Sequence, residues 1–164
     1  MPLFFCLNLY MDQLIKYLED IKNKFNAKYF MLNIVGRNNK VRNLIIELNT
    51  QDQLYNKGID SNNDSLGNYA PFTIREKQRK GQPTDRVTLK DTGAFYKSFD
   101  VKVNGNGDID IVADTIKYGF DGAWDLQEIY GVDIIGLNQT SLNELISELI
   151  IILQKFLRTN VFKI

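Results

Sequence analysis

Asp91-Thr92-Gly93 is the run in this chain whose residue types and spacing best suit catalysis. A carboxylate held by a Thr-Gly turn can form half of an acid–base pair when a second copy of the chain supplies the other half. Two carboxylates at such short range share one proton, because like charges that close cannot both ionise. The same tripeptide also forms ordinary turns, in which Asp accepts backbone hydrogen bonds and Gly supplies a positive φ.

The run Asp91–Ala94 resembles the Asp-Thr-Gly-Ala of retroviral-type aspartic proteases, and Ile134–Gly136 resembles their later apolar-apolar-Gly run. Lys90, however, stands where that family has a buried apolar residue. Phe95 and Tyr96 stand where it has a small or acidic residue, and that fold is nearly all β, whereas this chain is rich in helical patterns. We therefore favour the turn, which would feed a strand starting near Phe95. The homodimeric protease, with Asp91 as its catalytic residue, is the alternative.

Few other residues suit catalysis or metal binding. The chain of 164 residues has no histidine and one cysteine, Cys6, which removes Ser-His and Cys-His catalysis, internal disulfides and most zinc sites. The segment 60–64 begins like a calcium loop, but Ser65 stands where the loop needs Gly, and Pro71 where it needs Glu. We expect a solvated turn there, and a protein that is not an enzyme and holds no metal or cofactor.

Charge does not favour a dedicated nucleic-acid binder. Twenty basic and twenty acidic residues cancel, so no overall field attracts the protein to nucleic acid or acidic membranes. A local basic cluster consists of Arg75, Lys77, Arg79, Lys80 and Arg86. Such a cluster can bind phosphates, but a solvated loop or a docking surface for an acidic partner is the commoner role. We expect at most incidental contact with DNA.

The N-terminal segment Met1–Tyr10 is apolar, but it has neither the basic region nor the small-residue cleavage site of a signal peptide. It is also too short to span a bilayer. We interpret residues 1–11 as an arm. Because polar residues such as Ser147 and Glu148 interrupt the apolar C-terminal segment, we expect no transmembrane helix and a soluble protein made in the cytoplasm.

Helical periodicity predicts two N-terminal helices. Asp12 is a candidate N-cap for a helix over about residues 12–26, and a second apolar stripe predicts a helix over residues 39–54. Residues 30–35 alternate in a way that suits a strand or a helix almost equally. Further on, Tyr118 and Trp124 can line a pocket, although a role as core aromatic anchors is the commoner one.

The second half of the chain has the clearest β pattern. Residues 99–103 and 109–113 alternate between apolar and polar around an Asn-Gly turn, which predicts a hairpin with one buried face. Ser141 and Glu144 form a candidate capping box for a C-terminal helix. That helix carries more apolar residues than are needed to cover one sheet face, which favours a subunit contact.

Residues 51–90 are polar and punctuated by Gly and Pro. We interpret residues 56–88 as an extended arm or open hairpin that lies on a neighbouring subunit, since long structureless loops usually have a function. The element order predicts one α+β domain over residues 1–164. It has N-terminal helices, a central antiparallel sheet with the long arm, and, within residues 89–157, the hairpin and a C-terminal helix packed on the sheet.

The order of short motifs over about residues 50–157 resembles phage tail-completion (virion morphogenesis) proteins, in particular versions from phages of Bacteroidetes-type hosts. The run Leu66–Tyr69 leads through Thr73 and Lys77 to Leu89–Gly93, and Ile134–Leu137 precedes the last helix. Ser98-Phe99 also matches the family pattern. One departure is that the loop between Tyr118 and Ile134 lacks the His and the Arg-Pro often seen there.

The resemblance implies a structural virion protein of the head–tail junction or tail end, which acts by oligomeric assembly into a connector or tail-completion ring. Its partners would be further copies of itself and the neighbouring neck, portal or tail-tube proteins, with no membrane involved. It would reside in the virion, and in the bacterial host cytoplasm during assembly.

Overall fold

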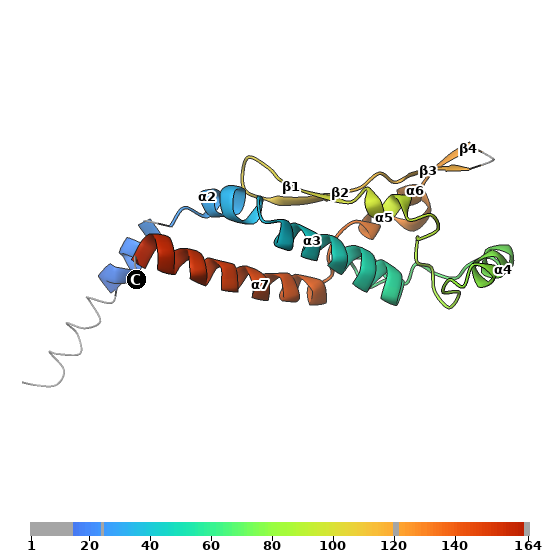
Figure 1. The fold of residues 1–164 in the computed structure, drawn as a ribbon, viewed down its shortest axis with the longest axis horizontal. Helices are drawn as coiled ribbons and strands as arrows, with labels where there is room; N and C mark the ends of the chain where they lie inside the picture. Colours follow the sequence, from blue (N-terminus) through green and yellow to red (C-terminus); the bar gives the residue numbers. More distant parts are fainter. Residues whose placement is uncertain (1–14, 24, 120–121, 163–164) are drawn as a thin grey trace, which may run out of the picture.

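The computed structural model of the chain describes residues 15–23, 25–119 and 122–162, which form an elongated body (Figure 1). Its helical segments are residues 15–23, α2 (Ala27–Tyr29), η1 (Phe30–Val35), α3 (Asn39–Glu47), η2 (Leu48–Lys57), α4 (Pro71–Arg79), α5 (Ala94–Lys97), α6 (Leu126–Tyr130), η3 (Val132–Ile134), α7 (Gln139–Leu157) and η4 (Arg158–Phe162). Its strands are β1 (Asp100–Val103), β2 (Ile109–Val112), β3 (Ile116–Gly119) and β4 (Gly122–Asp125). The predicted α+β class is confirmed.

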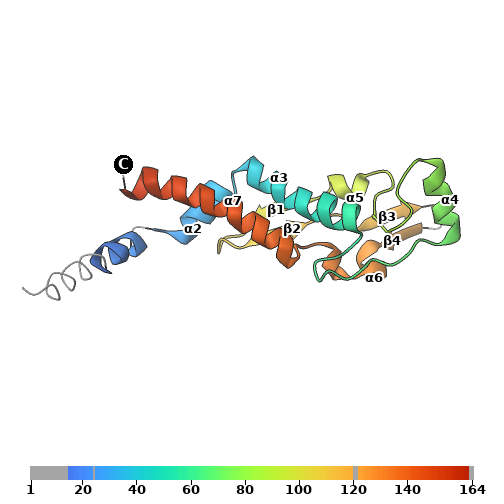
Figure 2. The same cartoon turned by 90° about the horizontal axis from the view of Figure 1, so that it is seen from below.

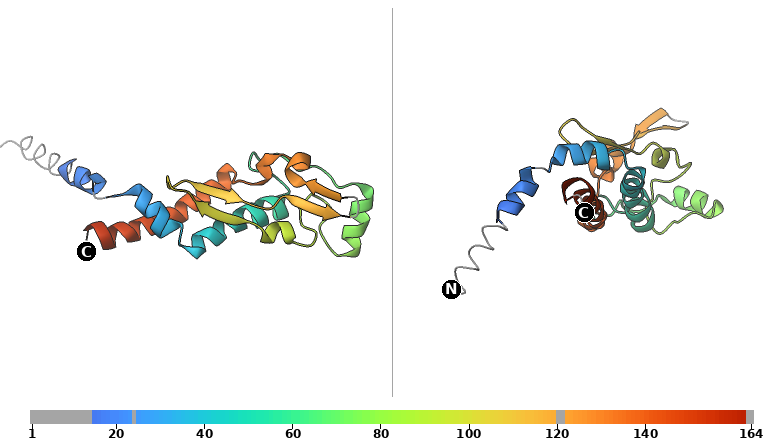
Figure 3. Two further views of the ribbon diagram at one scale, coloured as in Figure 1. Left: turned by 90° about the horizontal axis from the view of Figure 1, so that it is seen from above. Right: turned by 60° about the vertical axis from the view of Figure 1, so that its left-hand side comes forward.

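Helices α3 and α7 lie side by side along the long axis, and the β1–β2 hairpin lies over them (Figures 1 and 2). Helix α4 and the β3–β4 hairpin lie at one end of the body. The helix over residues 15–23 and the end of α7 lie at the other end (Figure 3). In place of one central sheet, the described strands form two separate two-stranded antiparallel sheets.

The N-terminal part is helical throughout its described residues, apart from short breaks. The candidate cap Asp12 and the arm over residues 1–11 lie outside the described residues. The ambiguous segment 30–35 is helical, because Asn26 caps α2 and the chain continues directly into the wider turns of η1. Phe30 and Val35 are both buried on the body-facing side of η1.

The predicted helix over residues 39–54 is confirmed and extends to Lys57. Asn38 starts it, since its side-chain oxygen accepts hydrogen bonds from the backbone N–H groups of Lys40 and Val41. The helix ends at Gly58, which has a φ of 64°. A Cβ at Gly58 would also lie 2.9 Å from the Val87 carbonyl oxygen, so both conformation and space require glycine there.

The expectation of an extended arm over residues 56–88 is wrong at its centre, where α4 forms. Pro71 begins α4, a position at which its missing N–H costs nothing. Before α4, the Asp60 carboxylate accepts hydrogen bonds from the N–H groups of Asn62 and Asp64, which makes the predicted turn. After α4, Val87 and Leu89 are buried, so this part of the segment packs into its own body.

Asp91-Thr92-Gly93 forms the predicted turn, but it does so through Thr92. The Thr92 hydroxyl oxygen accepts a hydrogen bond from the Ala94 N–H, and Gly93 has a φ of 82°. The turn leads into the short helix α5, so the expected strand start near Phe95 is wrong. The side chain of Phe95 lies 5.0 Å from Phe99 between ring centroids, and both rings are buried.

The predicted hairpin is confirmed as β1–β2, with Val101 opposite Ile111 and Val103 opposite Ile109. The Asn104 side chain shapes its turn by accepting hydrogen bonds from two backbone N–H groups within it. A second hairpin, β3–β4, follows and runs into α6. It was not predicted, because its strands are mostly exposed, and one ends in Gly119 while the other begins with Gly122, so no buried apolar face produces a clear alternating pattern.

The C-terminal helix is confirmed, but the predicted capping box is wrong. Asn138 is the N-cap, and its side-chain oxygen accepts a hydrogen bond from the Ser141 N–H at 2.9 Å. Ser141 is buried inside α7. None of the helices among the described residues is long and apolar enough to cross a membrane.

Two hydrophobic cores lie along the body. One gathers Val35, Val41, Ile45, Val101 and Leu145, and so joins α7 to α3 and the β1–β2 hairpin. The other gathers nine buried residues at the α5 and α6 end: Leu54, Leu66, Val87, Leu89, Phe95, Tyr96, Phe99, Leu126 and Ile134. Ile46 and Ile111 pack against both cores, so the two ends are continuous.

Two buried amide side chains on η2 hold the segment that leads into α7. Asn49 accepts a hydrogen bond from the Gly136 N–H at 3.0 Å and donates to the Ile134 carbonyl at 3.2 Å. Gln53 donates to the Gly136 carbonyl at 2.9 Å and accepts from the Asn138 N–H at 2.9 Å. These bonds satisfy backbone groups that would otherwise be buried without partners.

We predict that Gln53→Ala lowers the free energy of unfolding by about 2–4 kcal/mol, because it leaves the Gly136 carbonyl and the Asn138 N–H without partners. Urea unfolding followed by circular dichroism measures this. Asn56→Ala, at an exposed position of the same helix, is the matched control and should change stability by less than about 0.5 kcal/mol. Equal effects of the two substitutions would contradict the role of Gln53.

Candidate functional site

A groove of about 500 Å³ lies at the end of the body formed by α4, the 89–91 segment, the β3–β4 hairpin and α6. We call it the α4–α6 groove. Its walls combine aromatic and apolar residues with lysines, among them Tyr69, Phe72, Lys80, Lys117, Trp124 and Ile129. Its volume falls in the range of pockets that bind ligands or peptide side chains.

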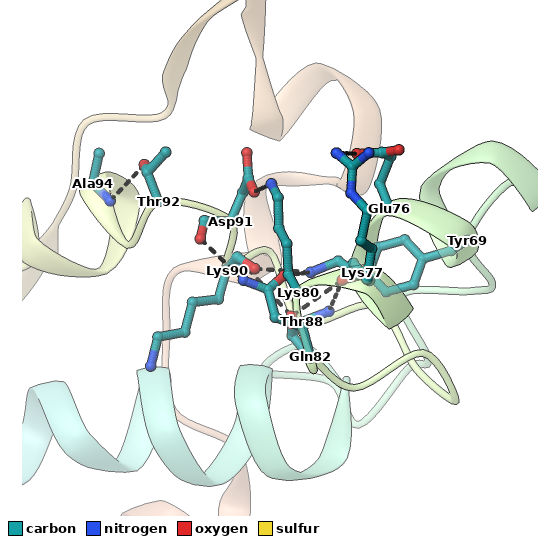
Figure 4. A network of polar contacts seen from close by, with 11 residues as sticks. Tyr69, Glu76, Lys77, Lys80, Gln82, Thr88, Lys90, Asp91, Thr92 and Ala94 are labelled. Atoms are coloured by element: carbon teal, nitrogen blue, oxygen red, sulfur yellow. Dashed lines mark hydrogen bonds and ion pairs between the residues drawn. The ribbon is translucent and has the colours of Figure 1, made fainter.

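Lys77 ties α4 to the chain that follows it. Its ammonium donates hydrogen bonds to the Gln82 side-chain oxygen at 3.0 Å and to the Lys90 carbonyl at 2.9 Å (Figure 4). It also lies 4.9 Å from the centre of the Tyr69 ring. Lys77 is buried, and these contacts compensate for the hydration that its charge has lost.

The segment 88–90 is held by side-chain hydroxyl groups rather than by a partner strand. The Tyr69 hydroxyl oxygen accepts a hydrogen bond from the Thr88 N–H at 2.8 Å, and the Tyr96 hydroxyl donates to the Thr88 carbonyl. Burial raises the pKa of Tyr96, so it remains a neutral donor. Leu89 has a φ of 53°, which turns its side chain into the core.

Asp91 lies at the edge of the groove and pairs with Lys80 at 2.9 Å (Figure 4). The hydrogen bond from Lys80 and the nearby positive charges hold the pKa of Asp91 below its usual value, and partial desolvation only partly opposes them. Asp91 is therefore ionised at neutral pH and its charge is compensated within the chain. A catalytic carboxylate pair instead needs one member whose pKa is raised.

Four of the five residues of the predicted basic cluster already bind other groups of the chain. Lys77 is buried and Lys80 pairs with Asp91. Arg79 pairs with Glu76, and Arg86 donates to the Tyr55 carbonyl and pairs with Asp85, while Arg75 is exposed. Most of these cations therefore tie the chain to itself, and the sequence alone does not show this because their partners are set by the fold.

Trp124 and Tyr118 are exposed, with 45% and 85% of their surface accessible, so their expected role as core anchors is wrong. Trp124 lines the α4–α6 groove. A Cβ on Gly119 would lie 2.8 Å from its indole, so glycine lets the ring lie against the strand. In the β3–β4 register, Trp124 lies directly opposite Lys117.

The described part of the chain holds no group of three or more His, Cys, Asp or Glu side chains placed to bind a metal ion. The groove therefore offers cations, hydroxyl groups, aromatic faces and two carboxylates that already have basic partners. This arrangement is suited to binding another molecule by contact.

We predict that Asp91→Asn lowers the free energy of unfolding at neutral pH by no more than about 1 kcal/mol, because the Lys80–Asp91 pair is nearly half exposed and screened by water. A lowered pKa stabilises the fold above the unfolded-state value of about 4, so the difference should shrink as the pH falls below it. Urea unfolding at neutral and acidic pH measures this.

Asp108→Asn on the exposed β1–β2 turn is the control for this substitution, and it should have little effect at either pH. A loss of stability at neutral pH that exceeds that of a surface ion pair, or one that persists in acid, would contradict the assigned role of Asp91.

In comparisons with protein-family models, with curated proteins and with solved structures, no match to this chain was found. We therefore infer a function from the geometry of the groove and from the surfaces of the elements around it.

Proposed function

We propose that this protein is a structural subunit of a phage virion, at the head–tail junction or tail end, and that it acts by assembly rather than catalysis. The observation that carries the proposal is the exposed apolar surface of α7. Leu142, Ile146 and Ile150 recur at a spacing of four residues and are 37%, 49% and 47% exposed. Such a stripe on the longest helix is typical of a surface that another chain covers.

The stripe is suited to contact with a further copy of the chain. Its neighbours along one flank of α7 are neutral, namely Asn143, Ser147 and Gln154, so a different surface of a second copy can cover this flank without burying unpaired charge. Packing it would remove several large aliphatic side chains from water, each contributing on the order of 1 kcal/mol or more.

The elongated shape supports ring formation. The far end of α7 lies at one end of the body, and α4 and the β3–β4 hairpin lie at the other (Figures 1 and 3). A ring of identical subunits uses two different surfaces of each subunit, joined head to tail. The motif order over residues 50–157, which resembles that of tail-completion proteins, supports a location in the virion, and in the host cytoplasm during assembly.

The homodimeric protease has less support. Its catalytic carboxylate would be Asp91, which is compensated by Lys80 and has a lowered pKa. The elements around Asp91 are the short helix α5 and helix α4, where the protease would have strands. On these grounds we propose no catalytic role for Asp91, and for DNA only incidental contact through residues such as Arg75.

We predict that Ile146→Lys combined with Ile150→Lys abolishes self-association of the purified chain, because each lysine would place a charge in the contact between copies. Multi-angle light scattering over a range of protein concentrations measures the mass of the assembly. Both positions are about half exposed, so the fold should persist, as circular dichroism would show.

A matched control is Asn106→Lys, which adds the same side chain to the exposed turn of the β1–β2 hairpin. It should leave the assembly mass unchanged. A wild-type chain that stays monomeric at every concentration and does not enter purified phage particles would overturn the proposed function.

A further inference from the structure

We propose that the α4–α6 groove binds an acidic peptide segment of another protein, in which a carboxylate side chain stands next to a large apolar one. This inference deepens the proposed function and rests on it, since the partner would be a neighbouring virion protein. The groove, at the end of the body away from residues 15–23, would recognise this neighbour by charge and by apolar contact.

The first support is that the apolar lining of the groove is left open to solvent. Phe72 of α4 is 66% exposed, Ile129 of α6 is 57% exposed and Trp124 of β4 is 45% exposed. These three side chains come from three different elements and line the same groove. Three large apolar residues exposed around one groove form the kind of contiguous patch that marks a binding surface.

The second support is the charge that remains once the internal ion pairs are counted. Two carboxylates line the groove: Asp91 pairs with Lys80, and Glu76 pairs with Arg79. Lys77, Lys90 and Lys117 also line it, and among the described residues none of the three has an ion pair with a carboxylate. The Lys77 ammonium is bonded only to neutral oxygens. The groove therefore has a net positive charge that a ligand carboxylate can compensate.

The third support is the pairing of Lys117 with Trp124 across the β3–β4 hairpin. Directly opposed side chains in an antiparallel pair project from the same face, with their Cβ atoms about 5 Å apart. The register thus places a lysine and the tryptophan on the same face of the hairpin. Gly119 leaves room for the indole to lie against the strand, which fixes this surface. In an extended peptide, an acidic residue could pair with Lys117 while a neighbouring Phe or Leu packs against Trp124.

A single-stranded nucleic acid fits the groove less well. Such ligands need a track of cations along successive phosphates as well as aromatic surfaces. Here Asp91 and Glu76 stand within the groove, and the basic residues Arg79 and Lys80 are already paired with them. The net charge of the whole chain is zero, so no wider field attracts a polyanion to the groove.

Trp124 is the only tryptophan of the chain, so its fluorescence reports on the groove alone. The full chain is titrated with a short peptide in which Glu and Ser residues flank a central Phe-Leu pair. We expect a saturable change in emission, and binding heat by calorimetry, that weaken as salt is raised. Peptides with Lys in place of Glu, or Ser in place of Phe-Leu, should bind at least several-fold more weakly.

Variants of the chain locate the binding. Lys117→Glu should lower the affinity for the acidic peptide by about tenfold, because a repulsion replaces an attraction at a partly exposed site. Phe72→Ser should also lower this affinity, because the apolar contact is lost. Residues 72 and 117 are both exposed enough that the fold should persist in the two variants. Lys102→Glu on β1, outside the groove lining, is the matched control and should bind as the wild type does.

Three outcomes overturn the inference. One is the absence of both an emission change and binding heat with the acidic peptide. Another is equal binding of the acidic and the Lys-containing peptides. The third is tighter binding of an oligothymidylate that Lys117→Glu abolishes, which would assign the groove to nucleic acid. Each is independent of the assembly mass measured with the Ile146 and Ile150 substitutions, so failure here leaves the proposed ring intact, and the converse also holds.

Discussion

The structure depends most on the two buried amides of η2, Asn49 and Gln53. Together they bind the backbone of residues 134–138 as an adjoining strand would, although they are side chains of a helix. This segment places Asn138, the N-cap of α7, so the position and direction of the longest helix depend on these bonds. Asn138 also donates to Asn63, which links the 60–64 turn to the same network.

This network lies between two hydrophobic cores, and it joins the two surfaces assigned to binding. Toward one end, the core around Leu145 supports the exposed stripe of α7; toward the other, the core around Leu89 and Leu126 supports the floor of the α4–α6 groove. Because buried polar groups tolerate only one arrangement, the network fixes the two surfaces relative to each other. A ring subunit that also binds a different neighbour needs such a fixed relation.

The helices over residues 15–23 and 39–57, the β1–β2 hairpin and the existence of α7 were predictable, since their signals are local. Periodic apolar residues and an Asn-Gly turn act within a few positions of the chain. Helix α4 and the β3–β4 hairpin were not, because they lack a periodic apolar stripe. Helix α4 is held instead by polar contacts with the segment that follows it, as Lys77 shows with its hydrogen bonds to Gln82 and to the Lys90 carbonyl.

The sequence by itself determined the turn at Asp91-Thr92-Gly93, because a glycine with positive φ and a threonine hydroxyl that accepts the N–H two residues on make that turn locally. It also determined the α+β class, and it indicated an apolar contact surface on the last helix. Only the tertiary structure decided that Asp91 pairs with Lys80 and that Trp124 lines a groove. The physical reason is that charge compensation and exposure depend on neighbours brought together by folding.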